Sequence, residues 1–124
     1  MIKILVADCH PVMRIGFKLA LQADPGIDII GEACNGPNAV KMAAELDPDV
    51  VLLDASMPGG EGFKALMDIK KNNTRTKIIV TSVAGDSNEL LEGIILGASA
   101  FVPANADGGK LLDVIRRVAA INRN

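Results

Sequence analysis

The sequence is poor in aromatic residues and in cysteine. The first shortage argues against stacking on bases or flat cofactors, and the second against a disulfide framework. It has three phenylalanines and neither tyrosine nor tryptophan. Binding of nucleic acid by base stacking depends on aromatic side chains, and so does the enclosure of a flat cofactor, so we expect neither. The two cysteines, Cys9 and Cys34, are too few for a disulfide framework and fit reduced thiols.

The chain also lacks a strong net charge and a long apolar run. Its formal net charge at pH 7 is −2, which provides no electrostatic attraction to nucleic acid or to an anionic membrane. No apolar run approaches the roughly 20 residues that span a bilayer. A core strand is expected directly after the first residues, which leaves no room for a signal peptide. We therefore expect a cytoplasmic protein that binds no membrane and makes no direct contact with nucleic acid.

What the sequence does contain is a regular alternation of short apolar runs and amphipathic segments over 124 residues, the usual size of one domain. Strands are predicted over 2–7, 27–33, 50–54, 77–82 and 99–102. Helices are predicted over 11–23, 37–46, 61–72, 86–96 and 108–122. In the third of these helices, Phe63, Leu66 and Met67 are expected to face the core. The runs at 2–7, 50–54 and 77–82 are apolar almost throughout, as is typical of parallel strands buried on both faces.

Five β/α units with short connections predict the fold class and the domain organisation. We expect one domain, residues 1–124, of the α/β class. Its fold would be flavodoxin-like and doubly wound, (βα)5, with a five-stranded parallel sheet of order 2-1-3-4-5 and helices on both faces. An eight-fold barrel would need about twice the length.

Acidic and hydroxyl side chains end three of the predicted strands. Asp8 follows the first strand, Asp54 ends the third and Ser82 ends the fourth. Ligands of such sheets bind beyond the carboxyl ends of the strands, near the switch point. Two carboxylates are costly to bury there without a cation or protons. The natural counter-charge is Mg²⁺, held by one or two carboxylates together with waters and a phosphoryl group. Two plainer interpretations stay open, in which Asp8 caps the next helix and Ser82 caps its strand.

Three stretches of the chain resemble a known family: "KILVADCHPVMRIGFKLAL", "IIGEACNGPNAVKMAAELDPDVVLLDASMPGGEGF" and "KIIVTSVAGDSNELLEGIILGASAFVPANA". They resemble the receiver domain of two-component response regulators, in the branch often fused to a helix-turn-helix output domain. The resemblance covers essentially the whole chain, and its most specific parts are "PDVVLLDxxMPGxxG" and "GASAF". Members of this branch usually continue into a linker and an output domain, so an excised domain of a longer regulator is one interpretation of the chain.

Residue by residue, the resemblance implies a site that receives a phosphoryl group from a partner, either a sensor histidine kinase or a phosphotransfer protein. Asp54 would accept the phosphoryl group, and Mg²⁺ would be bound by Asp8, Asp54 and the main-chain carbonyl of Ser56. The hydroxyl of Ser82 would move toward the phosphoryl group, and Phe101 would be the aromatic switch. The protein would not be an enzyme beyond catalysing its own phosphorylation and dephosphorylation.

Two positions depart from the family pattern, and both losses remove charge from the site. Cys9 stands where the family has a second acidic residue that binds Mg²⁺, and Ala104 stands where it has a lysine. A thiol is a poor ligand for a hard cation, so we expect weakened Mg²⁺ binding. Two hypotheses stay open. The chain is either a receiver phosphorylated at Asp54 or a pseudo-receiver that works independently of phosphorylation as a dimerisation or docking module.

The helix predicted over 86–96 bears on the second hypothesis. Asp86 is a candidate N-cap with Glu89 three residues later, the pattern of a capping box. Apolar side chains that include Leu91, Ile95 and Leu96 surround more of this helix than one buried face requires. Loose packing would explain them. So would an interface with a second copy or a partner protein, because this face and the last helix are where the resembling family often pairs.

Other functions fit the residues near the first strand less well. A flavin or redox protein of the same fold needs a phosphate loop rich in serine and threonine, where this chain has "DCHPV". A nucleophile–base pair of Cys9 and His10 has no third group to orient it, and we expect His10 to face solvent at the start of the next helix. A redox-sensing Cys9 would need nearby positive charge, whereas Asp8 and Asp54 are its expected neighbours.

Overall fold

A computed structural model describes residues 1–73, 75–82 and 87–121, and its elements follow the predicted alternation. The strands are β1 (Ile2–Ala7), β2 (Ile27–Ala33), β3 (Val50–Asp54), β4 (Lys77–Ser82) and β5 (Ala100–Pro103). The helices are α1 (Pro11–Gln22), α2 (Gly36–Leu46), α3 (Glu61–Asn72), α4 (Ser87–Ile95) and α5 (Gly108–Ala120), and the 3-10 turn η1 (Pro58–Gly60) precedes α3. The first four strands have the predicted bounds, and β5 begins one residue later than predicted. The predicted N-cap Asp86 lies outside the described residues.

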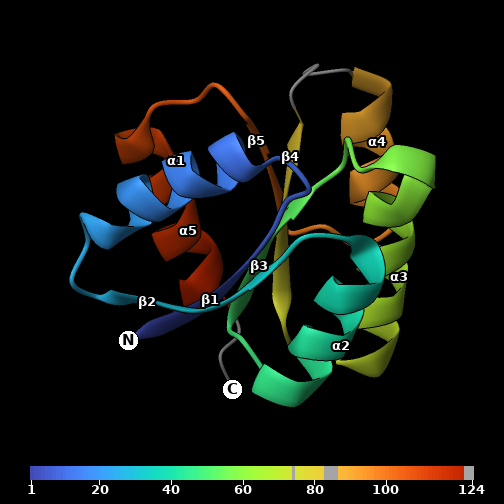
Figure 1. The fold of residues 1–124 in the computed structure, drawn as a ribbon, viewed down its shortest axis with the longest axis horizontal. Coiled ribbons are helices and arrows are strands. Elements are labelled where there is room, and N and C mark those ends of the chain that lie inside the picture. Colours follow the sequence, from blue (N-terminus) through green and yellow to red (C-terminus); the bar gives the residue numbers. More distant parts are fainter. Residues whose placement is uncertain (74, 83–86, 122–124) are drawn as a thin grey trace.

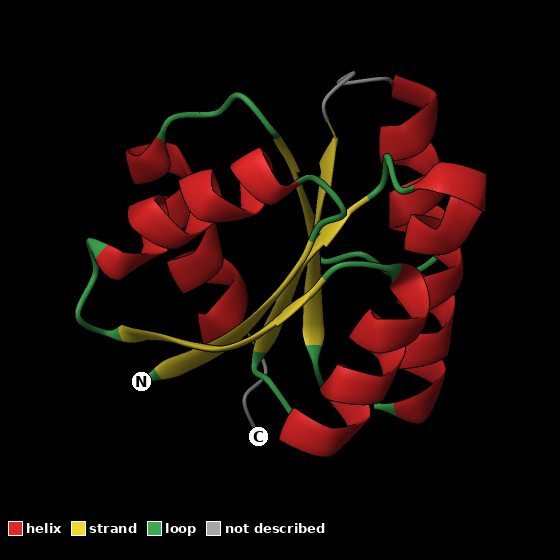
Figure 2. Ribbon diagram, in the orientation of Figure 1, coloured by secondary structure: helices red, strands yellow, loops and turns green. Residues whose placement is uncertain are grey.

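The five strands form one parallel sheet of order β2-β1-β3-β4-β5, which confirms the predicted fold class. Helices α1 and α5 cover one face, and α2, α3 and α4 cover the other (Figure 1 and Figure 2). The strand pairing brings Asp54 opposite Thr81 and Ser82 opposite Pro103. The carboxyl ends of β3, β4 and β5 therefore meet at one edge of the sheet. No helix among the described residues is long and apolar enough to cross a membrane.

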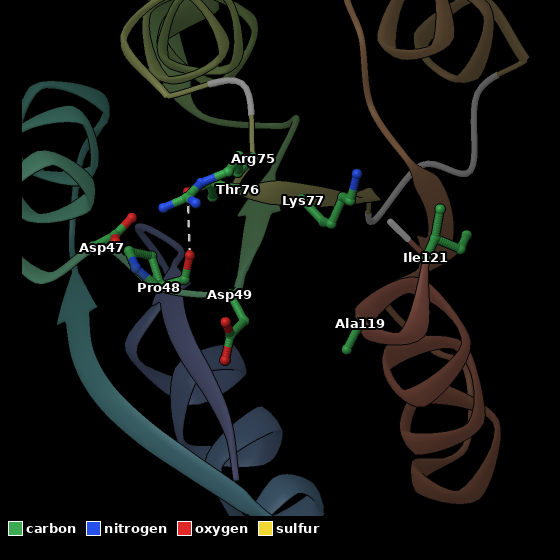
Figure 3. A pocket seen from close by; sticks show the side chains of 8 residues that line it. All are labelled: Asp47, Pro48, Asp49, Arg75, Thr76, Lys77, Ala119 and Ile121. Carbon is green, nitrogen blue, oxygen red and sulfur yellow. Dashed lines mark hydrogen bonds between the residues drawn. The ribbon is translucent and has the colours of Figure 1, made fainter. Parts of the chain in front are cut away.

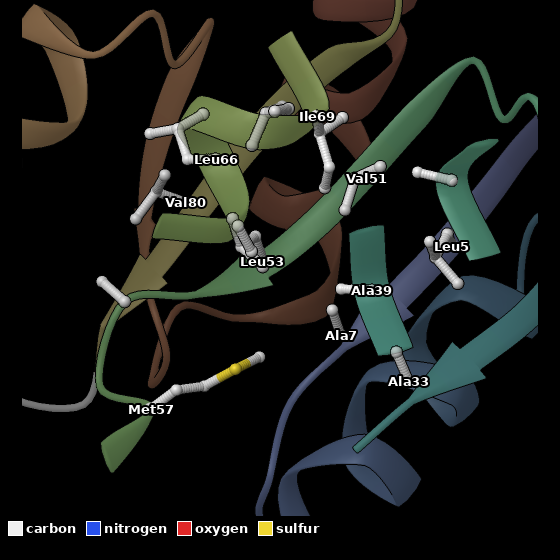
Figure 4. Close-up of a cluster of buried hydrophobic side chains, with 14 residues drawn as sticks. Leu5, Ala7, Ala33, Ala39, Val51, Leu53, Met57, Leu66, Ile69 and Val80 are labelled. Carbon is white, nitrogen blue, oxygen red and sulfur yellow. The ribbon is translucent and has the colours of Figure 1, made fainter. Parts of the chain in front are cut away.

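Two clusters of buried side chains hold the helices to the sheet, one on each face. Successive strand residues point to opposite faces, so Leu5 and Val51 face α2 and α3 while Ile4 and Val50 face α1 and α5. Because both faces are covered, every residue of β3 must be buried, which explains its continuous apolar run. The cluster on the α2 and α3 side, shown in Figure 4, consists of Leu5, Ala7, Ala33, Ala39, Ala43, Val51, Leu53, Ala55, Met57, Ala65, Leu66, Ile69, Ile78 and Val80.

Helix α3 differs from the prediction in the face that it buries. Ala65, Leu66 and Ile69 are buried against the sheet, and Phe63 is half-buried. Met67, which the sequence predicted to lie in the core, is 52% exposed, so that prediction is wrong. Helix α3 also packs beside α2, and Met67 remains exposed.

The turn between β3 and α3 depends on glycine. Gly59 and Gly60 both have positive φ angles, 69° and 72°, in the left-handed region that residues with a Cβ atom rarely adopt. This turn carries the chain from the end of β3 over the edge of the sheet and into α3. It leaves Asp54 as the last residue of its strand, facing the edge where the other strands end.

Candidate functional site

Asp8, Asp54 and Ser82 lie together at the carboxyl edge of the sheet, as predicted from the ends of their strands. All three are buried, with exposed fractions of 3%, 2% and 0%. Main-chain hydrogen bonds fix the segments that carry them, because the amide of Asp8 donates to the carbonyl of Ala33 (3.1 Å). The amide of Ala104 likewise donates to the carbonyl of Ser82 (3.0 Å). Ala104 therefore lies beside Ser82, where the family resemblance places a lysine.

The carboxylate of Asp54 is held by the loop that follows it. Its Oδ1 atom accepts a hydrogen bond from the amide of Ser56 at 2.7 Å. Burial raises the pKa of the Asp54 carboxyl and the nearby charge of Asp8 adds to the rise, while the hydrogen bond from Ser56 opposes it. The structure thus shows the amide of Ser56 in contact with Asp54. The role predicted for the Ser56 carbonyl, as a metal ligand, stays a prediction.

His10 is exposed at the start of α1, as expected, but its ring also contacts the buried carboxylates. Its side chain is half exposed, but its Nδ1 atom lies 3.1 Å from Oδ1 of Asp8 and 3.5 Å from Oδ2 of Asp54. The amide of His10 also donates to Oδ1 of Asp8 at 2.8 Å. Asp8 therefore does not cap α1 directly, because the N-cap of that helix is His10. Sequence reasoning missed His10 as a site residue, and its place two residues after Asp8 was the only available signal.

Cys9 completes a group of four possible ligands. Its Sγ atom lies 3.6 Å from Nδ1 of His10 and 4.0 Å from Oδ2 of Asp54. Burial raises the pKa of the Cys9 thiol, and the charges of Asp54 and Asp8 raise it further. The thiol and Asp8 approach the same nitrogen of His10, so Asp8 cannot orient the ring as the third member of a catalytic triad. These contacts agree with the expectation that Cys9 is not an activated nucleophile.

The hydroxyl of Ser82 does not point toward Asp54 in this structure. Its Oγ atom donates to Oε1 of Glu89 in the first turn of α4, at 2.5 Å. The predicted capping role of Glu89 gave no sign of this contact between β4 and α4. Phe101 is half-buried and packs against the core cluster on the α2 and α3 side.

A hollow of about 180 Å³ lies at the opposite edge of the sheet, between the amino ends of β3 and β4 and the end of α5 (Figure 3). Its polar groups hold the surrounding loops together. The hydroxyl of Thr76 donates to the carbonyl of Pro48 at 3.1 Å, and the carboxylate of Asp49 accepts from the amide of Lys3 at 2.8 Å. Thr76 and Asp49 serve structural contacts here, whereas the predicted site residues gather at the carboxyl edge, so we assign the candidate site to that edge.

Comparison with known proteins identifies the family. A model described as "Response regulator receiver domain" matches residues 4–116. The chain belongs to the response regulator receiver domain family. It is 32% identical over 117 residues to the nitrate/nitrite response regulator protein NarL of Escherichia coli (strain K12) and 35% identical over 116 residues to the transcriptional regulatory protein LiaR of Bacillus subtilis (strain 168). Both alignments cover 94% of this chain, but only 54% and 55% of the two relatives.

Solved structures support the same assignment. The response regulator domain of Thermotoga maritima CheB matches with a TM-score of 0.88 and 28% identity over 98% of both chains. A two-component response regulator of the LuxR family from Aurantimonas sp. SI85-9A1 matches with a TM-score of 0.89 and 27% identity, covering 95% of this chain and 84% of that one. The receiver domain spans about half the length of the curated relatives that it matches. Response regulator receiver domains are generally not enzymes.

Receiver domains bind Mg²⁺ at an acidic pocket, and the pocket of this receiver domain fits that ion poorly. Mg²⁺ requires oxygen ligands in near-octahedral geometry. Two buried carboxylates, Asp8 and Asp54, meet this requirement, but Cys9 and His10 present sulfur and nitrogen at the positions beside them. A thiol is a soft ligand and does not replace a carboxylate at a hard cation. Weakened Mg²⁺ binding therefore stays our prediction for this receiver domain.

Proposed function

We propose that the receiver domain accepts a phosphoryl group at Asp54 from a sensor histidine kinase or a phosphotransfer protein, and that it does so slowly. The observation that carries this proposal is the position of the Asp54 carboxylate. It ends the central strand β3 at the carboxyl edge of the sheet, where the amide of Ser56 fixes its Oδ1 atom. Its Oδ2 atom lies near Cys9 and His10, and the side chain of His10 is half exposed to solvent.

The proposed reaction joins a carboxylate oxygen of Asp54 to the phosphorus atom of the donor. The bond between phosphorus and the leaving group breaks, and the leaving group departs with the electron pair, giving an acyl phosphate on Asp54. The amide of Ser56 orients the carboxylate. Ala104 offers no cation to the phosphoryl oxygens, and Cys9 offers no oxygen ligand to Mg²⁺, so two sources of charge stabilisation are missing. This loss is the physical reason for a slow reaction.

We further propose that phosphorylation changes the partner of Ser82. In this structure its hydroxyl donates to Glu89, which ties the end of β4 to α4. An acyl phosphate on Asp54 would offer anionic oxygens at the same edge of the sheet, and charge-assisted hydrogen bonds to such oxygens are stronger than neutral ones. Release of Glu89 would then loosen α4 from β4. Phe101, on the neighbouring strand β5, is the residue whose environment we expect to report the change.

The test is Asp54→Asn treated with acetyl phosphate and Mg²⁺. Wild-type protein is expected to gain the mass of one phosphoryl group, measured by mass spectrometry of the intact chain. Asp54→Asn is expected to gain none, because an amide oxygen is not a nucleophile toward phosphorus. The variant should fold normally, because the amide oxygen of asparagine still accepts the hydrogen bond from Ser56.

The matched control is Asp28→Asn, which removes an exposed carboxylate from the neighbouring strand β2. This control is expected to be phosphorylated to the wild-type extent. No adduct on the wild-type protein at any Mg²⁺ concentration would contradict the proposal and favour the pseudo-receiver. An adduct that persists in Asp54→Asn would place the acceptor on another residue.

A second candidate function is docking through α4, and the exposure of that helix favours it. Leu91 is 58% exposed and Ile95 is 73% exposed, and both lie on the outer surface of α4. Leu96, which the sequence placed with them, is half-buried against the core cluster on the α2 and α3 side and is less available to a partner. We propose that this apolar surface binds a second copy of the chain, because related receivers dimerise and the small net charge opposes self-association only weakly.

The docking proposal predicts that Ile95→Glu weakens self-association by at least about tenfold, because the interface would have to bury a charge. Sedimentation velocity over a range of protein concentrations measures this. Leu19→Glu is the matched control, because Leu19 is an exposed apolar residue on α1, on the opposite face of the sheet. Docking through α4 would be refuted if the wild-type protein were monomeric at all concentrations. It would also be refuted if Ile95→Glu and Leu19→Glu weakened self-association equally.

A further inference from the structure

The four side chains at the carboxyl edge, Asp8, Cys9, His10 and Asp54, have the spacing of a tetrahedral metal site. Their ligand atoms all lie within 4.8 Å of one another. The Nδ1 atom of His10 lies 3.1 Å from Oδ1 of Asp8 and 3.5 Å from Oδ2 of Asp54. The Sγ atom of Cys9 lies 3.6 Å from that nitrogen and 4.0 Å from the same Asp54 oxygen.

These distances can be compared with the edges of a tetrahedron around Zn²⁺. Zn–N and Zn–O distances near 2.1 Å imply nitrogen–oxygen separations of about 3.4 Å, and a Zn–S distance near 2.3 Å implies separations from sulfur of about 3.6 Å. The four separations given above differ from these values by at most about 0.4 Å, and the other two, from Oδ1 of Asp8 to Cys9 and to Asp54, are below 4.8 Å. Shifts of this size need only small side-chain movements, so the ligands are close to a coordinating arrangement.

The chemistry of the four donors selects the kind of ion. A thiolate and an imidazole suit zinc and similar transition metals, whereas magnesium takes neither. The two carboxylates are almost fully buried, and each is costly to bury with its charge uncompensated. Arg14 does not neutralise Asp8, because its guanidinium donates to the main-chain carbonyl of that residue at 2.7 Å and its Nε lies 3.8 Å from a carboxylate oxygen of Glu32.

The geometry points to a Zn²⁺ site formed by Oδ1 of Asp8, Sγ of Cys9, Nδ1 of His10 and Oδ2 of Asp54. The substitution of Cys9 for the family's acidic residue then changes the ion that the pocket binds, instead of only weakening its binding of Mg²⁺. Among these ligands the ring of His10 is half exposed, whereas the two carboxylates are buried. The thiol of Cys9 releases its proton to solvent when the ion binds.

A regulatory consequence follows, and it rests on the proposed function. An ion bound to Oδ2 of Asp54 leaves only Oδ1 for attack on the phosphoryl donor, and Oδ1 already accepts the hydrogen bond from the amide of Ser56. Zinc-loaded protein is therefore expected to accept no phosphoryl group, and removal of zinc is expected to restore acceptance. Zinc would act as an inhibitor of the receiver at its own phosphorylation site.

The test of the metal site uses Co²⁺, a coloured ion that occupies tetrahedral zinc sites. The full chain is prepared without a histidine tag and under reducing conditions. It is expected to bind one equivalent of Co²⁺ with intense visible absorption, typical of tetrahedral coordination, and a thiolate-to-cobalt charge-transfer band. Competition against a coloured chelator then gives the Zn²⁺ affinity, which we expect to exceed the Mg²⁺ affinity.

Variants assign the ligands. Cys9→Ser is expected to lose the charge-transfer band and to weaken Zn²⁺ binding by more than about 10–100-fold, the usual loss for a residue that only supports a ligand. His10→Gln is expected to keep the charge-transfer band and to lose the tetrahedral spectrum. Cys34→Ser is the matched control, because Cys34 is the other thiol of the chain and lies outside the group of four. Circular dichroism confirms that each variant is folded.

The outcomes separate this proposal from the proposed function. A charge-transfer band that persists in Cys9→Ser, or Zn²⁺ affinity no higher than Mg²⁺ affinity, would overturn the zinc site. Phosphorylation of zinc-saturated protein would overturn the proposed inhibition by zinc, because the bound ion would then not block Asp54. If the band requires Cys9 but chelator-treated protein never accepts a phosphoryl group, the zinc site is supported and the proposed phosphorylation fails.

Discussion

Cys9→Asp is expected to raise the affinity of the pocket for Mg²⁺ by at least about 10–100-fold. Loss of a residue that only hydrogen-bonds to a metal ligand typically costs that much affinity, and a direct ligand should contribute at least as much. The reason is the donor set. The variant places a third carboxylate beside Asp8 and Asp54, and hard oxygen ligands are what Mg²⁺ requires. The initial rate of phosphorylation by acetyl phosphate should rise with it, and calorimetric titration with Mg²⁺ measures the affinity directly.

The same variant is expected to be less stable than the wild type when no divalent ion is present. Burial and the charges of Asp8 and Asp54 raise the pKa of the Cys9 thiol, so its surroundings disfavour a negative charge at this position. A third carboxylate without a cation adds repulsion, and Mg²⁺ removes it. Thermal unfolding of Cys9→Asp should therefore depend on Mg²⁺ much more steeply than thermal unfolding of the wild type.

Cys34→Asp is the control for this prediction, because it makes the same chemical change at an exposed position outside the pocket. It should leave both the Mg²⁺ affinity and the Mg²⁺ dependence of unfolding as they are in the wild type. Equal Mg²⁺ affinity of Cys9→Asp and the wild type would show that position 9 does not contact the ion. The thiol of Cys9 would then not be the cause of weakened Mg²⁺ binding.

The fold was predictable from the sequence because its central strands are buried on both faces. The run Val50–Asp54 has no exposed residue, so its apolar character is continuous and its end is marked by the first charged residue. The face of α3 was less predictable. Ala65 contributes little to an apolar pattern, yet it is buried in the core cluster, whereas the larger Met67 is exposed.

The candidate site was predictable only as far as main-chain positions determine it. Asp8, Asp54 and Ser82 were expected together because strand ends in a parallel sheet meet at one edge. The contacts of His10 and Glu89 were not, because they depend on side-chain conformations at the start of a helix and across a loop. The adjacency of Asp8, Cys9 and His10 in the sequence does not show that their side chains converge on Asp54, and the zinc proposal therefore needed the structure.

Gly62 in the first turn of α3 leads to the other large expected effect. A Cβ atom at this position would overlap the main-chain carbonyl oxygen of Asp54 and lie 3.1 Å from Cα of Ala55. Backbone atoms at the end of a central strand cannot move aside as a flexible side chain can. Gly62→Ala is therefore expected to lower the free energy of unfolding by about 1–3 kcal/mol, the usual cost of overpacking, with larger values within reach.

Urea denaturation followed by circular dichroism measures this change, and Gly16→Ala is the matched control. Gly16 also lies within a helix, but a Cβ atom there would meet nothing within 4 Å. Alanine at position 16 is expected to raise the free energy of unfolding by about 0.5–1 kcal/mol, because it loses less backbone entropy than glycine. The same substitution should thus have opposite signs at the two sites. A Gly62→Ala protein as stable as the wild type would show that α3 can move away from β3 at little cost, which contradicts this prediction.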